Sequence, residues 1–196
     1  MEPVERIDYL TDEEPAPGRL GLVQRFGNTV APEWNQEMLS SPERLRVVLV
    51  ALGLVDAAAT VTERDLQHAI ELREALRALA IANNGGPAAP EAERVVEQAA
   101  AGALGVGFED GLPRVAGSAA GVAGALATLV AIVAEAAAAG TWPRLKACPA
   151  AACGWLFFDR SRNRSRSWCD MAVCGNRTKT RAYRARRRVR DRRGSV

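Results

Sequence analysis

The 196-residue chain has four cysteines, all in its last quarter, and they form two C-x4-C pairs separated by fifteen residues. Each pair closes a short loop with a thiol at both ends, so two such loops can wrap one tetrahedral cation. Zinc suits this arrangement because a d10 ion accepts four thiolates without preferring another geometry. We therefore predict one structural zinc ion, and its ligands are Cys148, Cys153, Cys169 and Cys174.

Two other uses of these thiols are weighed against zinc. Two disulfides would need an oxidising compartment, and the acidic first fourteen residues do not resemble the cationic and apolar leader of a secreted chain. A redox switch, in which oxidation of the thiolates releases the metal, is a second alternative. A tetrathiolate zinc has no open coordination position, so hydrolytic chemistry at the metal is disfavoured.

The charge distribution divides the chain just before the cysteines. Residues 144–196 carry 16 Lys or Arg against 3 Asp, a net charge of +13, whereas residues 1–143 carry 10 Arg against 20 acidic residues, a net charge of -10. We expect a flexible leader over residues 1–18, a helical domain over residues 19–140 and a basic zinc finger over residues 144–196. A tail this basic predicts a polyanionic partner, most simply nucleic acid.

The spacing of apolar residues before the finger predicts a mainly α-helical domain. Helix starts are indicated at Ser41 and at Thr62, because Ser and Thr cap helices and Asp65 stands where a capping box needs an acid. The Asp110-Gly111 turn between two short apolar segments predicts a small β-hairpin. The expected elements are helices over 41–52, 62–82, 89–101 and 118–139, and a hairpin over 103–115.

An uncharged stretch over residues 115–134 has the length of a membrane span. It is rich in alanine and glycine, which gain little free energy on transfer to lipid, and no aromatic residues flank it. We therefore expect a buried helix of the domain and no membrane partner.

The finger is expected to have one short strand, over Gly154–Asp159, and to draw much of its folding free energy from zinc. After this strand, four arginines alternate with Ser and Asn, so an extended segment would place their guanidinium groups on one side, facing phosphate; a solvated loop is the alternative. From Thr178 onward a helix is expected, with four more arginines inside a 60-degree arc. These candidate nucleic-acid contacts are Arg160, Arg162, Arg164, Arg166, Arg177, Arg181, Arg184 and Arg188.

The segment Trp168–Arg177, which ends in Cys-Gly-Asn-Arg, resembles the CGNR zinc-finger family. The preceding thiol pair, the aromatic strand ending in Asp and the Arg-Ser stretch occur there in the same order. The resemblance implies that the four cysteines bind the metal and that residues after Cys174 contact DNA, which adds Asn176 and Lys179 to the candidates. Gly175 is expected to take a left-handed conformation on leaving the thiol loop, and Asn176 to cap the following helix.

Upstream, Phe26–Val30, Leu72–Arg77 and the predicted hairpin resemble the ABATE domain, a helical domain proposed to sense small molecules. Gly27 stands where a larger apolar residue is expected. The resemblance makes Asn28 and Thr29 candidate contacts of an effector.

Arg73 and Arg77 lie one helical turn apart and are further candidates for binding a carboxylate ligand. Pairing of these arginines with Glu71 or Glu74 is the alternative.

Catalysis is not expected, since the chain has one histidine, His68, and neither a glycine-rich phosphate loop nor a hydrolase motif. These patterns predict a cytoplasmic, nucleoid-associated, zinc-dependent DNA-binding transcriptional regulator, whose helical domain senses a small ligand or mediates association. A homodimer would suit palindromic DNA. The alternatives are an RNA- or ribosome-binding zinc protein and a protein-interaction module with a basic surface.

Overall fold

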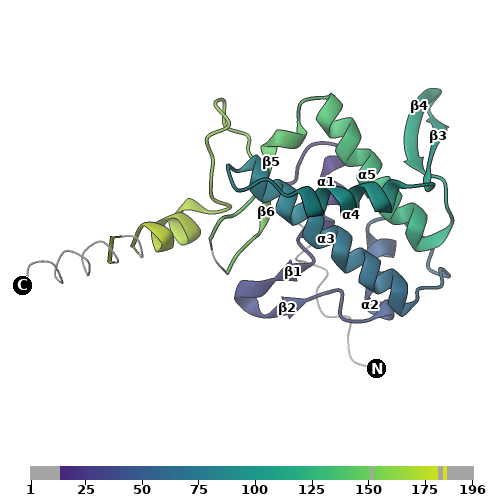
Figure 1. The fold of residues 1–196 in the computed structure, drawn as a ribbon, viewed down its shortest axis with the longest axis horizontal. Coiled ribbons are helices and arrows are strands. Elements are labelled where there is room, and N and C mark those ends of the chain that lie inside the picture. The colour runs from purple at the N-terminus through teal and green to yellow at the C-terminus, as the bar shows by residue number, and fades with distance from the viewer. Residues whose placement is uncertain (1–13, 151, 181–182, 185–196) are drawn as a thin grey trace, which may run out of the picture.

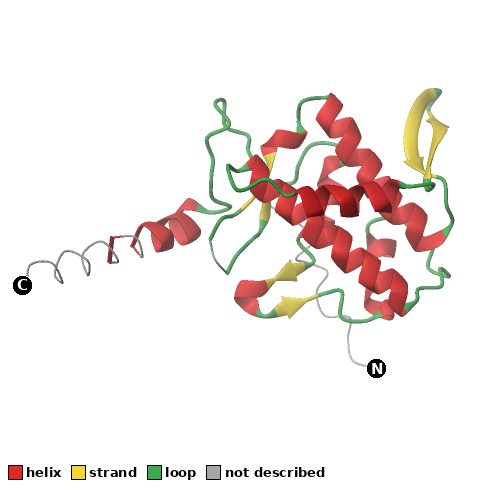
Figure 2. Cartoon of the chain, viewed as in Figure 1, coloured by secondary structure: helices red, strands yellow, loops and turns green. Residues whose placement is uncertain are grey.

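A computed structural model describes residues 14–150, 152–180 and 183–184 of the chain. Its helices pack into one body, and its strands form three separate two-stranded sheets (Figures 1 and 2). This is the mainly α-helical architecture, with small β elements, that the sequence predicts. Residues 1–13 of the expected leader lie outside the described part, and within the rest of it Ala16 is buried and its N–H donates to Gln24 Oε1.

The first three helices begin where local chemistry favours a helix. Helix α1 (Leu20–Gly27) was not assigned from sequence and buries one side against the rest of the body. Helix α2 (Pro42–Ala51) starts after Ser41, whose hydroxyl accepts a hydrogen bond from the Arg44 N–H at 3.2 Å. Helix α3 (Glu63–Asn83) starts with a reciprocal capping box between Thr62 and Asp65. Both predicted helix starts are therefore confirmed.

Two small hairpins accompany these helices. Strands β1 (Val30–Ala31) and β2 (Gln36–Glu37) flank a 3-10 turn, η2 (Pro32–Trp34), and are too short for a periodic pattern to predict. Strands β3 (Leu104–Glu109) and β4 (Leu112–Gly117) form the predicted hairpin, whose turn residues Asp110 and Gly111 both have positive φ. This second hairpin follows helix α4 (Pro90–Ala100) and projects from one end of the body (Figure 1).

The long apolar helix is α5 (Gly121–Ala138), which starts three residues later than the sequence predicts. Ser118 still belongs to the sheet end, where its N–H donates to the Ala103 carbonyl. Among the described residues α5 is the one helix that is long and apolar enough to cross a membrane. In this structure Leu126, Leu129 and Ile132 of α5 are buried in the body, which makes α5 a core helix.

The last two strands connect the body to the cysteine region. Strands β5 (Leu145–Ala147) and β6 (Leu156–Phe158) are antiparallel, with Leu145 opposite Phe158 and Ala147 opposite Leu156. The side chains of these four residues are buried in the same apolar core as helices α1, α3 and α5. The strand that the sequence predicts for the finger, β6, thus pairs with β5 and completes the core of the helical body.

We predict that Leu156→Ala destabilises the whole chain. Leu156 is fully buried, so the substitution removes apolar contacts and leaves a cavity, at a cost of about 2–5 kcal/mol. Urea denaturation followed by helical circular dichroism should show this loss, whereas Val106→Ala on the exposed β3–β4 hairpin should change stability by less than about 0.5 kcal/mol. An unaltered helical transition in Leu156→Ala would show that the body folds without β6.

Candidate metal centre

The β5–β6 hairpin has a second face, which points away from the body core. Lys146 and Phe157 are directly opposite each other there, since side chains alternate between the two faces of a strand. Phe157 is buried with Cys148 and Cys174 in a second, smaller apolar cluster, against which Trp168 also packs. The cysteine cluster is therefore built on the face of the β5–β6 hairpin that points away from the body, and the opposite face packs into the body core.

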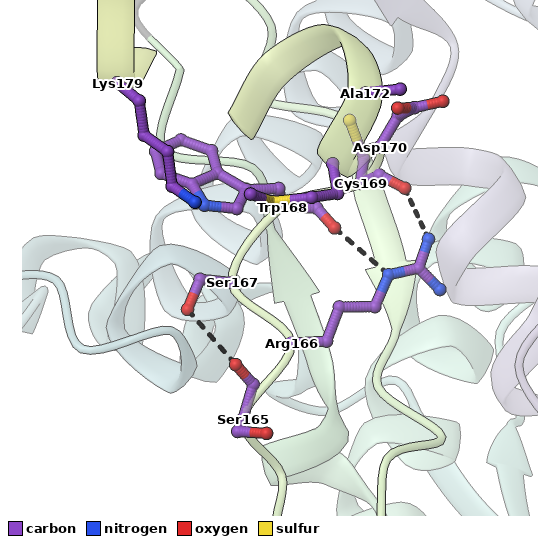
Figure 3. Close-up of a pocket in the computed structure, with 9 residues that line it drawn as sticks. Ser165, Arg166, Ser167, Trp168, Cys169, Asp170, Ala172 and Lys179 are labelled. Atoms are coloured by element: carbon purple, nitrogen blue, oxygen red, sulfur yellow. Dashed lines mark hydrogen bonds between the residues drawn. The ribbon is translucent and has the colours of Figure 1, made fainter. Parts of the chain in front are cut away.

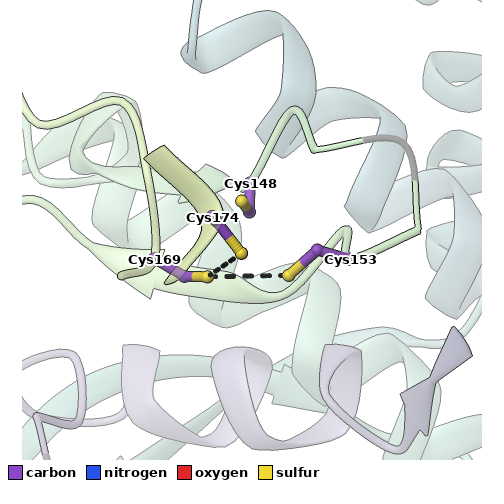
Figure 4. A group of neighbouring side chains, drawn as sticks. All are labelled: Cys148, Cys153, Cys169 and Cys174. Carbon is purple, nitrogen blue, oxygen red and sulfur yellow. Dashed lines mark hydrogen bonds between the residues drawn. The ribbon is translucent and has the colours of Figure 1, made fainter. Parts of the chain in front are cut away.

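The four cysteine sulfur atoms lie within 4.8 Å of one another (Figure 4). Cys169 Sγ is 3.5 Å from Cys153 Sγ and 3.6 Å from Cys174 Sγ. Tetrahedral zinc, with Zn–S bonds of about 2.3 Å, separates its sulfur ligands by about 3.8 Å, so the cluster fits one such ion. All four thiols are unbridged, and the alternative of two disulfides does not fit these separations.

The thiols of the cluster perturb one another strongly. Hydrogen bonds from Cys153 and Cys169 lower the pKa of the Cys148 thiol, and the same contacts with Cys148 raise the pKa of the Cys153 and Cys169 thiols. Burial raises the pKa of the Cys174 thiol. Thiols this close to one another resist carrying several negative charges together, whereas a divalent cation, when bound, stabilises all four as thiolates.

Each thiol pair is held by its own turn. In the first loop the Cys148 N–H donates to the Trp155 carbonyl and the Cys153 N–H to the Ala150 carbonyl, both at 2.9 Å.

In the second loop Cys174 lies in a single π-helical turn, Met171–Gly175, which Asp170 caps by accepting a hydrogen bond from the Val173 N–H. The short loops therefore present their thiols to one point.

Two expectations at the end of the second loop are wrong. Gly175 was expected to be left-handed, but it lies in the π-helical turn, and the space that a side chain would need is filled by Met171 and Trp168. Asn176 was expected to cap a helix, but it already has helical φ and ψ, since the chain passes directly from the π turn into the helix. Close packing, rather than backbone freedom, explains the glycine.

A buried ion pair organises the chain after β6. Lys146 Nζ lies 2.8 Å from Asp159 Oδ2 and also donates to the carbonyls of Arg164 and Arg166. Asp159 in turn accepts hydrogen bonds from the N–H and hydroxyl of Ser161 and from the Arg166 N–H. Burial alone would raise the pKa of Asp159, but the hydrogen bonds from Lys146 and Ser161 hold it below its ordinary value. The sequence does not indicate this pair, because β5, the strand that carries Lys146, was not predicted.

Arg166 is a structural residue in this arrangement. Its guanidinium donates to the carbonyls of Trp168 and Cys169 (Figure 3), pairs with Glu14 at 2.8 Å, and lies 5.1 Å from the centre of the Phe157 ring. All these contacts bind the arginine to the protein. Arg166 therefore does not point outward with its neighbours as the alternating pattern predicted.

Two other arginines of the predicted surface also contact the body. Arg160 donates to the Pro15 carbonyl at 2.6 Å and lies 5.5 Å from the centre of the Phe158 ring. Arg177 forms an ion pair with Glu33 of η2. The contact of Arg177 is exposed, in contrast to the buried pair of Lys146.

The remaining described candidates are exposed to solvent. A turn over Ser161–Arg164, in which Arg164 has a positive φ of 53 degrees, replaces the expected extended segment. Residues 176–180 are helical, as are residues 183–184. Arg181 and Arg188 lie outside the described residues. The exposed candidates are Arg162, Arg164, Asn176, Lys179 and Arg184.

A groove of about 670 Å³ runs between the second thiol loop and the following helix (Figure 3). Its lining includes the indole of Trp168, the ammonium of Lys179 and the hydroxyls of Ser165 and Ser167. A cation beside small hydroxyl donors suits a phosphate oxygen.

The four residues expected to contact an effector lie together, and their polar groups bind other parts of the protein. The Asn28 amide pairs with Leu156 in both directions: Nδ2 donates to the carbonyl at 3.0 Å, and Oδ1 accepts from the N–H at 2.8 Å. The Thr29 hydroxyl donates to the Phe26 carbonyl at 2.7 Å. Asn28 thereby satisfies the outer edge of β6, and Gly27 allows the approach because a Cβ there would lie 2.6 Å from Leu156 Cδ2.

Arg73 and Arg77 are both buried on the side of α3 that faces this region. Arg73 makes two hydrogen bonds to the carboxylate of Glu37 in β2, at 2.6 and 2.8 Å, and one to Glu74. Arg77 pairs with the other oxygen of Glu74 at 3.3 Å, and burial lowers its pKa. The predicted alternative of pairing with Glu74 is observed, together with Glu37, which the sequence did not indicate.

We predict that Asp159→Asn lowers the free energy of unfolding of the finger far more than a surface substitution does. The substitution leaves the Lys146 ammonium buried without a carboxylate, and breaking a buried ion pair costs about 3–5 kcal/mol. Denaturant titration of tryptophan fluorescence measures the loss. The control Glu91→Gln breaks the exposed pair with Arg94 and should cost at most about 1 kcal/mol. Equal losses in the two variants would contradict the structural role of Asp159.

Metal analysis of the purified, reduced chain should give one zinc ion per molecule. We predict that Cys169→Ser loses this ion, because its sulfur lies between two other thiols and three ligands bind zinc much more weakly than four. Ser167→Ala, two residues away, should retain full zinc content. Stoichiometric zinc in Cys169→Ser would place the metal elsewhere.

Comparison with known families agrees with this geometry. The model of the CGNR zinc finger matches residues 144–187, which include all four cysteines. The model of the ABATE family, described as "Putative stress-induced transcription regulator", matches residues 20–141. No curated protein matches the chain at a significant level. Since the second match covers more than half of the sequence, the chain belongs to the ABATE family and has a CGNR zinc finger with one structural zinc ion after the ABATE domain.

Proposed function

We propose that this zinc-binding regulator binds DNA through the outward side of its finger. The observation that carries the proposal is the set of exposed cations on the finger that make no ion pair within the described residues. They lie on the turn after β6 and in the helical residues 176–180 and 183–184, all at the end of the molecule opposite the β3–β4 hairpin (Figure 1). These cations are Arg162, Arg164, Lys179 and Arg184.

The contacts of the other arginines support this assignment. Arg160 and Arg166 hold the finger against residues 14 and 15, so they position the basic surface rather than form it. Arg177 pairs with Glu33 at the surface, and an exposed ion pair of this kind contributes little to stability, because water screens it. A phosphate can therefore replace the Glu33 carboxylate at Arg177 at little cost.

Zinc has a structural role in this proposal. Four thiolates leave no coordination position for water, and the cluster holds the second loop from which the basic helix starts. The groove beside Trp168 extends the same surface, with Lys179 on one side. We propose no enzymatic activity, and we place the protein in the cytoplasm, where its thiols stay reduced.

Competition separates DNA binding from its alternatives. Labelled duplex DNA is displaced by unlabelled duplex DNA or by single-stranded RNA, each at two salt concentrations. Preference for the duplex supports the DNA proposal, and preference for RNA supports the RNA-binding alternative. Displacement by an acidic polypeptide with the same efficiency as DNA would favour a protein-interaction surface.

We predict that Lys179→Ala combined with Arg184→Ala weakens DNA binding and reduces its salt dependence. Each lost phosphate contact should lower the slope of log affinity against log salt by about one unit. Fluorescence anisotropy at several salt concentrations measures both quantities. Arg94→Ala on α4 is the matched control, since it removes an exposed arginine from the body. A double variant with the wild-type slope would move the contact surface away from this helix.

A further inference from the structure

A buried arginine of the body, Arg77, lies against the first thiol loop of the finger. Arg77 of α3 is 8% exposed. Its guanidinium nitrogen Nη2 fills the space that a Cβ at Gly154 would need, and its Cζ is 3.1 Å from that point. Gly154 directly follows the ligand Cys153 and has a φ of +60 degrees. The guanidinium therefore contacts the backbone that leaves the metal ligand.

The charge of the metal centre makes this contact significant. Zinc with four thiolates has a net charge of -2, and the cluster is largely withdrawn from solvent, with Cys148 and Cys174 buried. A buried negative centre is stabilised by a nearby cation, because the interaction of charges is strong where water is excluded. Lys146, a buried cation of the finger, is already neutralised by Asp159.

Of the two buried arginines of α3, Arg77 has the less fully balanced charge. Arg73 has its own carboxylate, Glu37, through two short hydrogen bonds, and also binds Glu74 at 2.9 Å. Arg77 shares Glu74 with Arg73, at a longer distance of 3.3 Å, and the Glu74 side chain is 52% exposed. One half-exposed carboxylate thus serves two buried guanidinium groups.

We propose that Arg77 is a positioning residue of the zinc centre: it stabilises the charge of the tetrathiolate from outside the ligand set and holds the first thiol loop against α3. The affinity for zinc then depends on a residue of the ABATE domain, and metal binding stabilises the helical body as well as the finger. The proposal goes beyond nucleic-acid binding. Its test is made without DNA, so the two can fail separately.

The test compares zinc affinity among variants of the full chain, by competition with a chromogenic chelator. Arg77→Met keeps the length and apolar contacts of the side chain but removes its charge, and we expect the dissociation constant for zinc to rise about 10- to 100-fold, as for other residues that support metal ligands. Arg77→Lys keeps the charge and should stay within about threefold of the wild type. An equal loss in the two variants would overturn the electrostatic role.

Arg73→Met is the matched control. It removes a buried arginine from the same helix, four residues away, but its partners are Glu37 and Glu74 rather than the thiol loop. We expect it to lower the thermal stability of the body and to leave zinc affinity within about threefold of the wild type. If Arg73→Met lost as much zinc affinity as Arg77→Met, any destabilising change in α3 would weaken zinc binding, which would contradict the proposal.

The absorption spectrum of bound Co²⁺ provides a readout that does not depend on the overall stability of the chain. With Co²⁺ in the site, the sulfur-to-cobalt charge-transfer band should shift to longer wavelength in Arg77→Met, because removing a cation raises the energy of the sulfur electrons, and it should not shift in Arg73→Met. An unshifted band in Arg77→Met contradicts the proposal. If Arg77→Met does not fold, Arg77→Gln, which is also uncharged but keeps hydrogen-bond donors, takes its place with the same expected shift.

Discussion

The two faces of the β5–β6 hairpin determine how the rest of the molecule is arranged. Leu145, Ala147, Leu156 and Phe158 face the body, where they close a core made by α1, α3 and α5. Phe157 and Lys146 face the other way and support the cysteine cluster and the chain that follows it. Because side chains alternate strictly along a strand, a shift of one residue in register would turn the core side chains away from the body and put Lys146 and Phe157 in their place. One short hairpin therefore fixes both the fold of the body and the location of the metal centre.

Such a shared hairpin requires polar partners wherever its edges are buried, since an unpaired backbone group away from water is costly. Asn28 meets this requirement at β6 by giving and accepting a hydrogen bond with Leu156, much as a third strand would. Asn83 and Asn84, at the end of α3, do the same for β5 by donating to the carbonyls of Leu145 and Ala147. Asn28, a candidate contact of an effector, thus uses its side-chain amide to join the two parts of the chain.

Local signals in the sequence were sufficient for elements whose causes are local. The capping box of Thr62, the cap at Ser41 and the Asp110-Gly111 turn each act within a few residues, and the cysteine spacing alone indicates the metal cluster. Strands of two or three residues contain no measurable period, so β1, β2 and β5 could not be found. The contacts of Arg166 could not be found either, because its carbonyl, carboxylate and aromatic partners come from three separate regions of the chain.

The fold also sorts the arginines of the finger, which composition alone treats as one basic tail. On the side that faces the body, Arg160, Arg166 and Arg177 contact Pro15, Glu14 and Glu33, so part of the acidic character of the body is used to hold the finger in place. On the opposite side the cations have solvent as their environment. Long-range attraction between a body of charge -10 and a finger of charge +13 is screened within about 8 Å in physiological salt, so among the described arginines it is those in direct contact with the body that are neutralised. Among the described residues the positive surface that remains is therefore smaller than their composition implies, and it lies at the end of the molecule opposite the β3–β4 hairpin (Figure 1), where a polyanion can approach.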